Sequence, residues 1–272
     1  MRNYIYKIFI SAILICFTAC EVEEGGDSNR KTIQGMIAFE TTNGFITDGI
    51  SILEIMARVN YYGEADEDLK EGIRNYYLDE YKVTSVENVW TLKSNGAEFI
   101  FTHNGKSINE AGAVWTARII FKDSYQEKEV VNGNFRVETV GEKEWMLKST
   151  DMINLNSWDY SNENEKHTNE LYIKGNNADI KSSNLYDYVV ESGNGKITGN
   201  PVFTYKVTSP LFYYESLFYY ISPISIGLRG GELDINADDK DKITAEVYIE
   251  NSLPNYKITF NGITEDWNSY YW

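Results

Sequence analysis

Aromatic side chains are the residues of this chain whose types and spacing best suit them to hold a ligand. The sequence contains 21 Tyr, 12 Phe and 6 Trp. One aromatic pattern occurs twice in succession, as LFYYES over 211–216 and as LFYYIS over 217–222. An even period keeps aligned residues on the same face of a strand, so Phe212 aligns with Phe218. Aromatic rings have an apolar face, and the tyrosine hydroxyl adds a polar tip. The repeat is therefore either a binding surface or part of a packed strand.

The same segment is also compatible with a short buried helix, because Ser209-Pro210 suits a helix start and Ser222-Pro223 suits a helix end. In a strand, Glu215 would be the only charged residue, and an exposed strand with so little charge would tend to pair with other chains. We therefore expect Phe212 and Phe218 to be buried. The tyrosines of the repeat should be partly exposed, since their hydroxyl groups need partners.

The two histidines give no support for catalysis. His103 lies beside the dipeptide Asn104-Gly105, and His167 lies in a charged stretch. Neither is at motif spacing from a serine, an acid or the other histidine, so both are expected to be solvated residues of turns or loops. The sequence also has no phosphate-binding glycine loop and no dinucleotide motif. It indicates no catalytic residue and no cofactor.

The region from Asp234 to Asp241 is the only one that resembles a cation site. Its alternating acids and amides are typical of the start of a calcium loop. However, Asp239 and Ala245 occupy the positions where such a loop needs its glycine and its bidentate glutamate. We therefore expect a solvated hairpin loop and no metal.

The formal charge of −16 excludes one broad class of partner. A strongly acidic surface repels phosphate groups, so nucleic acid is not an expected partner. The 41 acidic residues leave open a hydrolase that uses a pair of carboxylates, but the sequence indicates no particular pair.

The N-terminus has the order of a secretory signal. Arg2 and Lys7 precede an apolar run over 8–17, which is too short to span a membrane. The tetrapeptide FTAC ends at Cys20 and resembles the lipobox of bacterial lipoproteins. This resemblance implies that signal peptidase II cleaves before Cys20 and that the residue receives acyl chains such as palmitate. Cys16 would be lost with the signal, so no disulfide is expected.

The acidic stretch after Cys20 resembles the export signal of Bacteroidetes-type surface lipoproteins, although a plain solvated linker remains an alternative. We expect a signal peptide over 1–19, a flexible tether over 20–31 and one β-rich domain over 32–272. The resemblance implies a location at the outer membrane, held by the lipid anchor and facing the cell exterior.

Many members of this broad group bind glycans, so the resemblance implies a surface protein that binds glycan or another extracellular ligand and is not an enzyme. A subunit of an envelope complex, with another envelope protein as its partner, is the alternative, and a glycoside hydrolase is less favoured. Sugar rings have apolar CH faces that pack on tyrosine and tryptophan. The candidate ligand-binding residues are therefore Tyr213, Tyr214, Tyr219, Tyr220, Trp158 and Tyr160, each of which could instead be packed in the β-sheet.

Helical and strand periodicity indicate the elements that would position these residues. A first strand is expected over 32–39, a helix over 48–62 that ends at Gly63, and a second helix over 64–80. A long exposed loop is expected over 159–169, as a possible boundary within the domain.

From residue 81 onward, alternating segments predict many short strands. These are expected over 89–93, 97–102, 114–121, 134–140, 145–148, 170–174, 202–208, 242–250 and 255–260. Asn-Gly dipeptides at 95, 104, 132, 194 and 261 predict tight turns. The fold class is thus mainly β: an antiparallel sandwich or partly open barrel with one or two N-terminal helices.

Overall fold

The computed structural model describes residues 27–66, 70, 78, 81–94, 97–123, 128–131, 133–153, 166–177, 185–199, 201–215, 226–250 and 253–268. Over these residues the chain is mainly β, and a long helix precedes the strands. The fold class expected from the sequence is therefore confirmed.

The helix is α2 (Asp27–Glu64). The strands in the described residues are β1 (Lys82–Val86), β2 (Val89–Lys93), β3 (Ala97–His103), β4 (Val114–Asp123), β5 (Lys128–Val131), β6 (Asn134–Gly141), β7 (Glu144–Met152), β8 (Lys166–Asn177), β9 (Tyr186–Thr198), β10 (Phe203–Glu215), β11 (Ile226–Ala237), β12 (Asp241–Glu250), β13 (Leu253–Phe260) and β14 (Ile263–Asn268).

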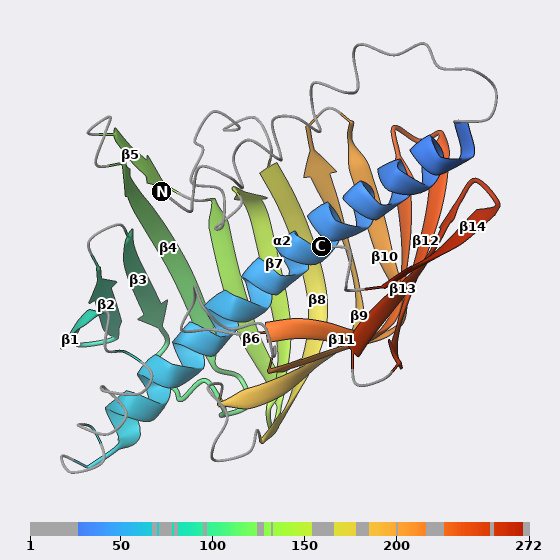
Figure 1. Ribbon diagram of the computed structural model, residues 1–272. Coiled ribbons are helices and arrows are strands. Elements are labelled where there is room, and N and C mark those ends of the chain that lie inside the picture. Colours follow the sequence, from blue (N-terminus) through green and yellow to red (C-terminus); the bar gives the residue numbers. More distant parts are fainter. Residues whose placement is uncertain are drawn as a thin grey trace, which may run out of the picture.

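These strands form one antiparallel sheet whose order follows the chain from β1 to β14. The short strand β5 pairs with β4 outside this path, and β6 is the next strand in the main order. Among the described residues β1 and β14 stay at opposite ends, so the sheet is not closed into a barrel. Figure 1 shows that the sheet curves around α2, which runs diagonally across its concave side.

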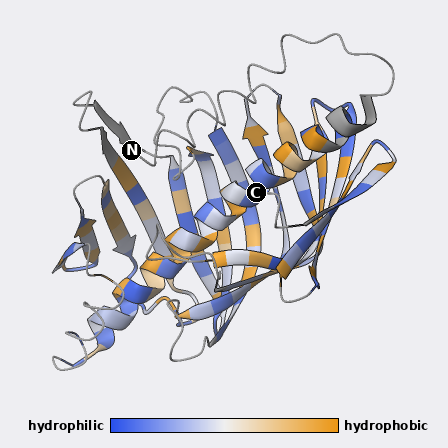
Figure 2. Cartoon of the chain, viewed as in Figure 1, coloured by the Kyte–Doolittle hydropathy of each residue, from blue (hydrophilic) through white to orange (hydrophobic). Residues whose placement is uncertain are grey.

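Alternation of side chains along the strands builds the core between the helix and the sheet. In β6 and β7, Phe135, Val137, Trp145 and Leu147 are buried, and the residues between them are more exposed. The hydropathy colours alternate in the same way along the strands in Figure 2. Successive side chains in a strand point to opposite faces, so the buried set faces the helix.

The convex face of the sheet is polar across β7, β8 and β9. Lys148 Nζ lies 2.8 Å from Glu170 Oε1. Lys174 Nζ lies 3.8 Å from Glu144 Oε1 and 3.5 Å from Glu191 Oε1. Such exposed pairs contribute little to stability, about 0–1 kcal/mol each. They do keep this face hydrophilic.

Three helix glycines, spaced 14 residues apart, lie close to side chains of the sheet. A Cβ atom on Gly35 would lie 2.8 Å from Ile258 Cγ2 of β13, and one on Gly49 would lie 3.4 Å from Leu147 Cδ1 of β7. A Cβ atom on Gly63 would lie 2.7 Å from Trp90 Cζ2 of β2. Fourteen residues make about four helical turns, so the three contacts follow one gradually turning face. The helix therefore crosses the sheet from β13 to β2.

The helix differs from the sequence-based expectation at its N-terminal side. The strand expected over 32–39 is wrong, because these residues belong to α2. Residues 27–31, expected to be flexible tether, are helical as well. The helix expected over 48–62 is present as the second part of a longer one, and most of the helix expected over 64–80 lies outside the described residues. Glycines and threonines over 35–49 hid the helical pattern, since both have low helix propensity.

Residues 52–60 of α2 are all buried, which an amphipathic helix would not require. The polar members have partners in the core. Arg58 Nε donates to Glu54 Oε1 at 2.8 Å, and Tyr188 of β9 donates its hydroxyl proton to Glu54 Oε2. The backbone N–H of Leu185 also donates to Glu54 Oε1, at 2.8 Å. These bonds satisfy a buried charge and fix the helix against β9.

The Asn-Gly dipeptides have different outcomes. Asn261 and Gly262 have φ values of 48° and 86° between β13 and β14, as the expected type I′ turn requires. The turn expected at Asn194-Gly195 is wrong, because both residues lie inside β9. A Cβ on Gly195 would lie 2.4 Å from Tyr205 Cε1, so this glycine makes room for a ring of β10. The dipeptide at 95–96 and Asn132 lie outside the described residues.

Candidate binding pocket

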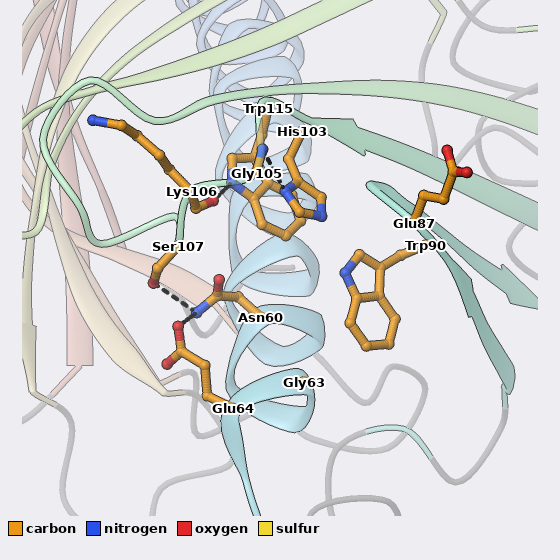
Figure 3. Close-up of a pocket in the computed structure, with 10 residues that line it drawn as sticks. All are labelled: Asn60, Gly63, Glu64, Glu87, Trp90, His103, Gly105, Lys106, Ser107 and Trp115. Atoms are coloured by element: carbon orange, nitrogen blue, oxygen red, sulfur yellow. Dashed lines mark hydrogen bonds between the residues drawn. The ribbon is translucent and has the colours of Figure 1, made fainter.

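An open pocket of about 220 Å³ lies where the C-terminal end of α2 meets the first strands of the sheet. Helix, turn, strand and loop residues all contribute to it (Figure 3). Its lining consists of Asn60, Gly63, Glu64, Glu87, Trp90, His103, Gly105, Lys106, Ser107 and Trp115. Rings and polar groups therefore converge on one site from segments that are distant in the sequence.

His103 lies flat on Trp115 at one side of the pocket. The ring centroids are 4.7 Å apart and the planes differ by 15°. Trp115 is buried, and its Nε1–H donates to Lys106 O at 3.1 Å. The N–H of Gly105 donates to His103 Nδ1 at 3.1 Å, so the proton of the neutral imidazole is on Nε2. That nitrogen lies on the side of the ring toward Trp90 in Figure 3.

Burial lowers the pKa of His103 below its usual value of 6.5. Removal of water from around the ring disfavours the charged form. His103 is therefore neutral near pH 7, with one N–H available as a hydrogen-bond donor. The sequence placed His103 at a turn as a solvated residue, whereas the structure places it at the end of β3, half-buried on an aromatic ring.

Trp90 supplies the second aromatic surface. Its ring is half-buried and packs over Gly63 of the helix. Tyr62 meets it edge-on, with centroids 6.2 Å apart and an interplanar angle of 79°. The indole nitrogen lies on the side of the ring toward His103 in Figure 3. The absence of a side chain on Gly63 lets Trp90 lie this close to the helix.

Asn60 fixes the polar edge of the pocket. Its Nδ2 donates to Glu64 Oε1 at 3.0 Å and to Ser107 Oγ at 3.1 Å. Its Oδ1 accepts from the N–H of Ile108 at 3.1 Å. One nearly buried amide thus joins the last turns of the helix to the loop between β3 and β4.

The same loop is also attached to the sheet. Ile108 O accepts a hydrogen bond from Thr139 Oγ1 at 2.6 Å and another from Trp145 Nε1 at 2.9 Å. Thr139 and Trp145 are buried on β6 and β7. The loop is therefore held in place before any ligand arrives, which lowers the entropic cost of binding.

Charge at the pocket is mostly negative. Glu64 and Glu87 are exposed acids of the lining. Lys106 is the only lysine or arginine among the lining residues, and its ammonium group lies 3.2 Å from Glu110 Oε1 and donates to Ala111 O at 3.0 Å. In Figure 3 this ammonium group points away from Trp90.

Of the ligand-binding residues expected from the sequence, the structure describes Tyr213 and Tyr214, and neither lines this pocket. Tyr213 is fully buried, and its hydroxyl donates to Asn43 Oδ1 of the helix at 3.0 Å. Tyr214 is 36% exposed on the opposite face of β10. Tyr219, Tyr220, Trp158 and Tyr160 lie outside the described residues, as does Cys20.

The expected burial of Phe212 is wrong, since this side chain is 38% exposed. Residues 211–215 are strand rather than helix, and irregular pairing between Val207 and Phe212 shifts the register. Leu211 and Tyr213 take the inward positions. Phe212 pairs with Gly230 of β11, and its ring covers the space that this glycine leaves empty.

His167 is also placed differently from the expected solvated loop. It belongs to β8, is 1% exposed, and packs on Phe45 of the helix with centroids 4.2 Å apart. Its Nδ1 lies 3.1 Å from Nδ2 of Asn169, whose Oδ1 accepts a hydrogen bond from Tyr205 Oη at 2.7 Å. Burial lowers the pKa of His167 to about 3. Residues 166–169 are thus core strand, and residues 159–165 lie outside the described residues.

The acidic cluster lies on β11, the turn after it and the start of β12. Asp234 Oδ1 accepts from Thr244 Oγ1 at 2.9 Å, and Asp238 Oδ1 accepts from the N–H of Val202 at 2.9 Å. Asp241 Oδ1 accepts from Asn261 Nδ2 at 2.7 Å. Three of these carboxylates thus bond groups of the protein. Across the described part of the chain, no group of three or more His, Cys, Asp or Glu side chains is placed to hold a metal ion.

Comparison of the chain with known protein families, with curated proteins and with solved structures found no match. None of the helical segments that the structure describes combines the length and the apolar character that a membrane span requires.

The pocket residues were not identified from the sequence, because they come from four separate segments. One signal was present. Gly63 at the expected helix end indicated a place where another segment could approach closely, and Trp90 is the side chain that does so. Nothing in the sequence connected these residues with Asn60 or His103.

Proposed function

We propose that the protein is a cell-envelope lipoprotein, attached to the outer membrane through acyl chains on Cys20, that faces the cell exterior and binds glycan at the pocket around Trp90. The proposal includes no catalytic step. The anchor rests on the order of basic residues, apolar run and lipobox at the N-terminus. The ligand class rests on the pocket.

The observation that most favours glycan is the combination of the Trp90 ring with polar groups at its border. Sugar rings pack their apolar CH faces on indole rings, which offer a large apolar face beside a polar N–H group. The N–H of His103 Nε2 suits a hydroxyl oxygen. Glu64 and Ser107 supply acceptor oxygens for sugar hydroxyl protons. The attachment of the loop by Asn60 keeps these groups in position.

Binding to a panel of neutral oligosaccharides tests this function, with Trp90→Ala as the main variant. We expect wild-type protein to bind at least one member and Trp90→Ala to bind it about tenfold or more weakly, a loss of about 1.4 kcal/mol, because the variant lacks the ring on which the sugar packs. Tyr214→Ala is the matched control, since it removes an exposed ring on another part of the sheet. Glycan binding that survives Trp90→Ala but is lost in Tyr214→Ala would place the site on β10 instead.

The anchor is tested separately with Cys20→Ala in the full chain. The unacylated product should no longer sediment with outer membranes after a carbonate wash. Membrane association that persists would contradict the proposed lipid anchor and would leave the proposed glycan binding at the pocket untouched.

A role as a subunit of an envelope complex is the second candidate, and the exposure of Phe212 and Tyr214 favours it. Both rings lie on the face of β10 that is turned away from the helix, where apolar side chains can mark a protein interface. In that case the panel would give no glycan binding, and replacing both rings with serine would release the protein from its complex.

A further inference from the structure

We infer that the pocket is selective for glycans that have a free amino group, and that the Glu64 carboxylate accepts the ammonium ion while the sugar ring lies on Trp90. This inference rests on the proposed glycan-binding function. It goes beyond that function by naming the sugar class and the residues that select it.

The first observation is the electrostatic character of the helix end. The pocket lies on the last turn of α2, where the aligned peptide dipoles leave a partial negative charge. This last turn contains no basic residue to balance the charge. Cations are therefore favoured and anions disfavoured at this end of the pocket, independently of any side chain.

The second observation concerns Glu64. One carboxylate oxygen, Oε1, accepts from Asn60 Nδ2, and this bond orients the group. Within the described residues, Oε2 has no hydrogen bond or ion pair. An ammonium group bound there would gain a charge-assisted hydrogen bond, which is about twice as strong as a neutral one. A hydroxyl group at the same place would gain only the weaker bond.

The third observation is the Trp90 ring, whose apolar face suits the CH face of the sugar that carries the amine. No positively charged side chain of the lining neutralises Glu64. Lys106 is held by Glu110 and Ala111, and Glu87 adds a second negative charge to the lining. Lys70 Nζ lies over the ring of Tyr62, 6.0 Å from its centroid, and Tyr62 meets Trp90 edge-on.

The neutral imidazole of His103 adds a donor on the side of the pocket toward Trp90. A donor there suits a sugar oxygen and not an ammonium group. The amine is therefore expected at the Glu64 side, with the sugar ring on Trp90 and an oxygen at His103. Sugars with carboxylate or sulfate groups would face two carboxylates and the negative helix end, so they should bind most weakly.

Calorimetry with two oligosaccharides of equal length tests the selectivity directly. One is a glucosamine oligomer, and the other is its fully N-acetylated counterpart. The pH is chosen so that the sugar amine is protonated while His103 stays neutral. We expect wild-type protein to bind the amine form about tenfold more tightly, in line with one charge-assisted hydrogen bond at an exposed site.

Glu64→Gln should remove this preference and lower the affinity for the amine oligomer to that for its N-acetylated counterpart, because an amide cannot form the ion pair. Glu250→Gln is the matched control, since it removes one exposed carboxylate at the end of β12, far along the sheet. It should retain the preference, which separates a local effect from general attraction to an acidic protein.

The outcomes separate the selectivity from the function. Equal binding of both oligomers by wild-type protein, or equal loss of preference in both glutamine variants, would overturn the amine site while leaving glycan binding intact. Absence of binding to these oligomers and to the whole neutral panel would overturn both proposals.

Discussion

Two histidines of this protein pack on aromatic rings, and their surroundings give them different roles. His167 packs on Phe45 beneath the helix, with centroids 4.2 Å apart, and His103 packs on Trp115 at the pocket, with centroids 4.7 Å apart. His167 is enclosed, and its Nε2 is buried without a hydrogen-bond partner in the described residues. His103 has one nitrogen fixed by Gly105 and the other toward the pocket.

The comparison shows that a histidine packed on an aromatic ring does not identify a binding site by itself. At both positions burial removes water from the imidazole and lowers its pKa. The difference lies in what covers the face of each imidazole ring that is turned away from its aromatic partner. Around His167 it is closed by helix and strand, so the residue contributes to packing, whereas around His103 it opens into a space bordered by Trp90.

The largest expected effect of this difference is acid destabilisation through His167. Its pKa is about 3 when folded and near 6.5 when unfolded, so the unfolded chain binds the proton more tightly. The stability that the neutral ring contributes is complete above pH 6.5 and is lost as the pH falls toward 3, by up to about 1.4 kcal/mol per pH unit. Urea unfolding at several pH values measures this slope.

His167→Phe should flatten that slope relative to wild type, because the phenyl ring keeps the contact with Phe45 and takes up no proton. His103→Phe is the comparison variant and should change the slope much less. Parallel curves for wild type and His167→Phe would contradict the assignment of a buried neutral histidine.

The Asn60→Ala variant tests how firmly the loop that lines the pocket is held in place. Asn60→Ala leaves the buried N–H of Ile108 without its partner, which costs about 1–3 kcal/mol, and it frees the loop that contains Ser107. Chemical unfolding and glycan titration should both register the change. Asn134→Ala removes an exposed amide that bonds Thr150 and should stay within about 0.5 kcal/mol of wild type. Unchanged glycan affinity in Asn60→Ala would show that the loop does not need this bond.

Two helix glycines provide the smallest and most specific contrast. Nothing lies within 4 Å of a Cβ on Gly44, so Gly44→Ala should stabilise the protein by about 1 kcal/mol through helix propensity alone. Gly63→Ala places a methyl group against Trp90 and should displace the indole ring, weakening glycan binding with little gain in stability. Thermal melts and titrations of both variants separate these effects, and unaltered binding by Gly63→Ala would contradict the contact.

The sequence predicted the strands better than the helix or the site. The strand predicted over 89–93 matches β2, because apolar Trp90 and Leu92 alternate with polar Thr91 and Lys93. The helix was recognised only in part, since glycines and threonines over 35–49 have low helix propensity and hide the helical pattern. The sequence could not show which of Tyr213 and Tyr214 is buried, because strand register decides which ring faces the helix. The pocket brings Asn60, Trp90 and His103 together from separate segments, and no local sequence pattern predicts that they line the same space.

The three glycines that face the sheet also limit how the length of α2 can vary. Inserting or deleting one residue between Gly35 and Gly63 would rotate the remainder of the helix by about 100°. One or two of the glycines would then leave the face where Ile258, Leu147 and Trp90 approach, and larger side chains would take their places. Homologous chains that keep this pocket should therefore keep the number of residues between these glycines unchanged, while the loops between strands are free to vary in length.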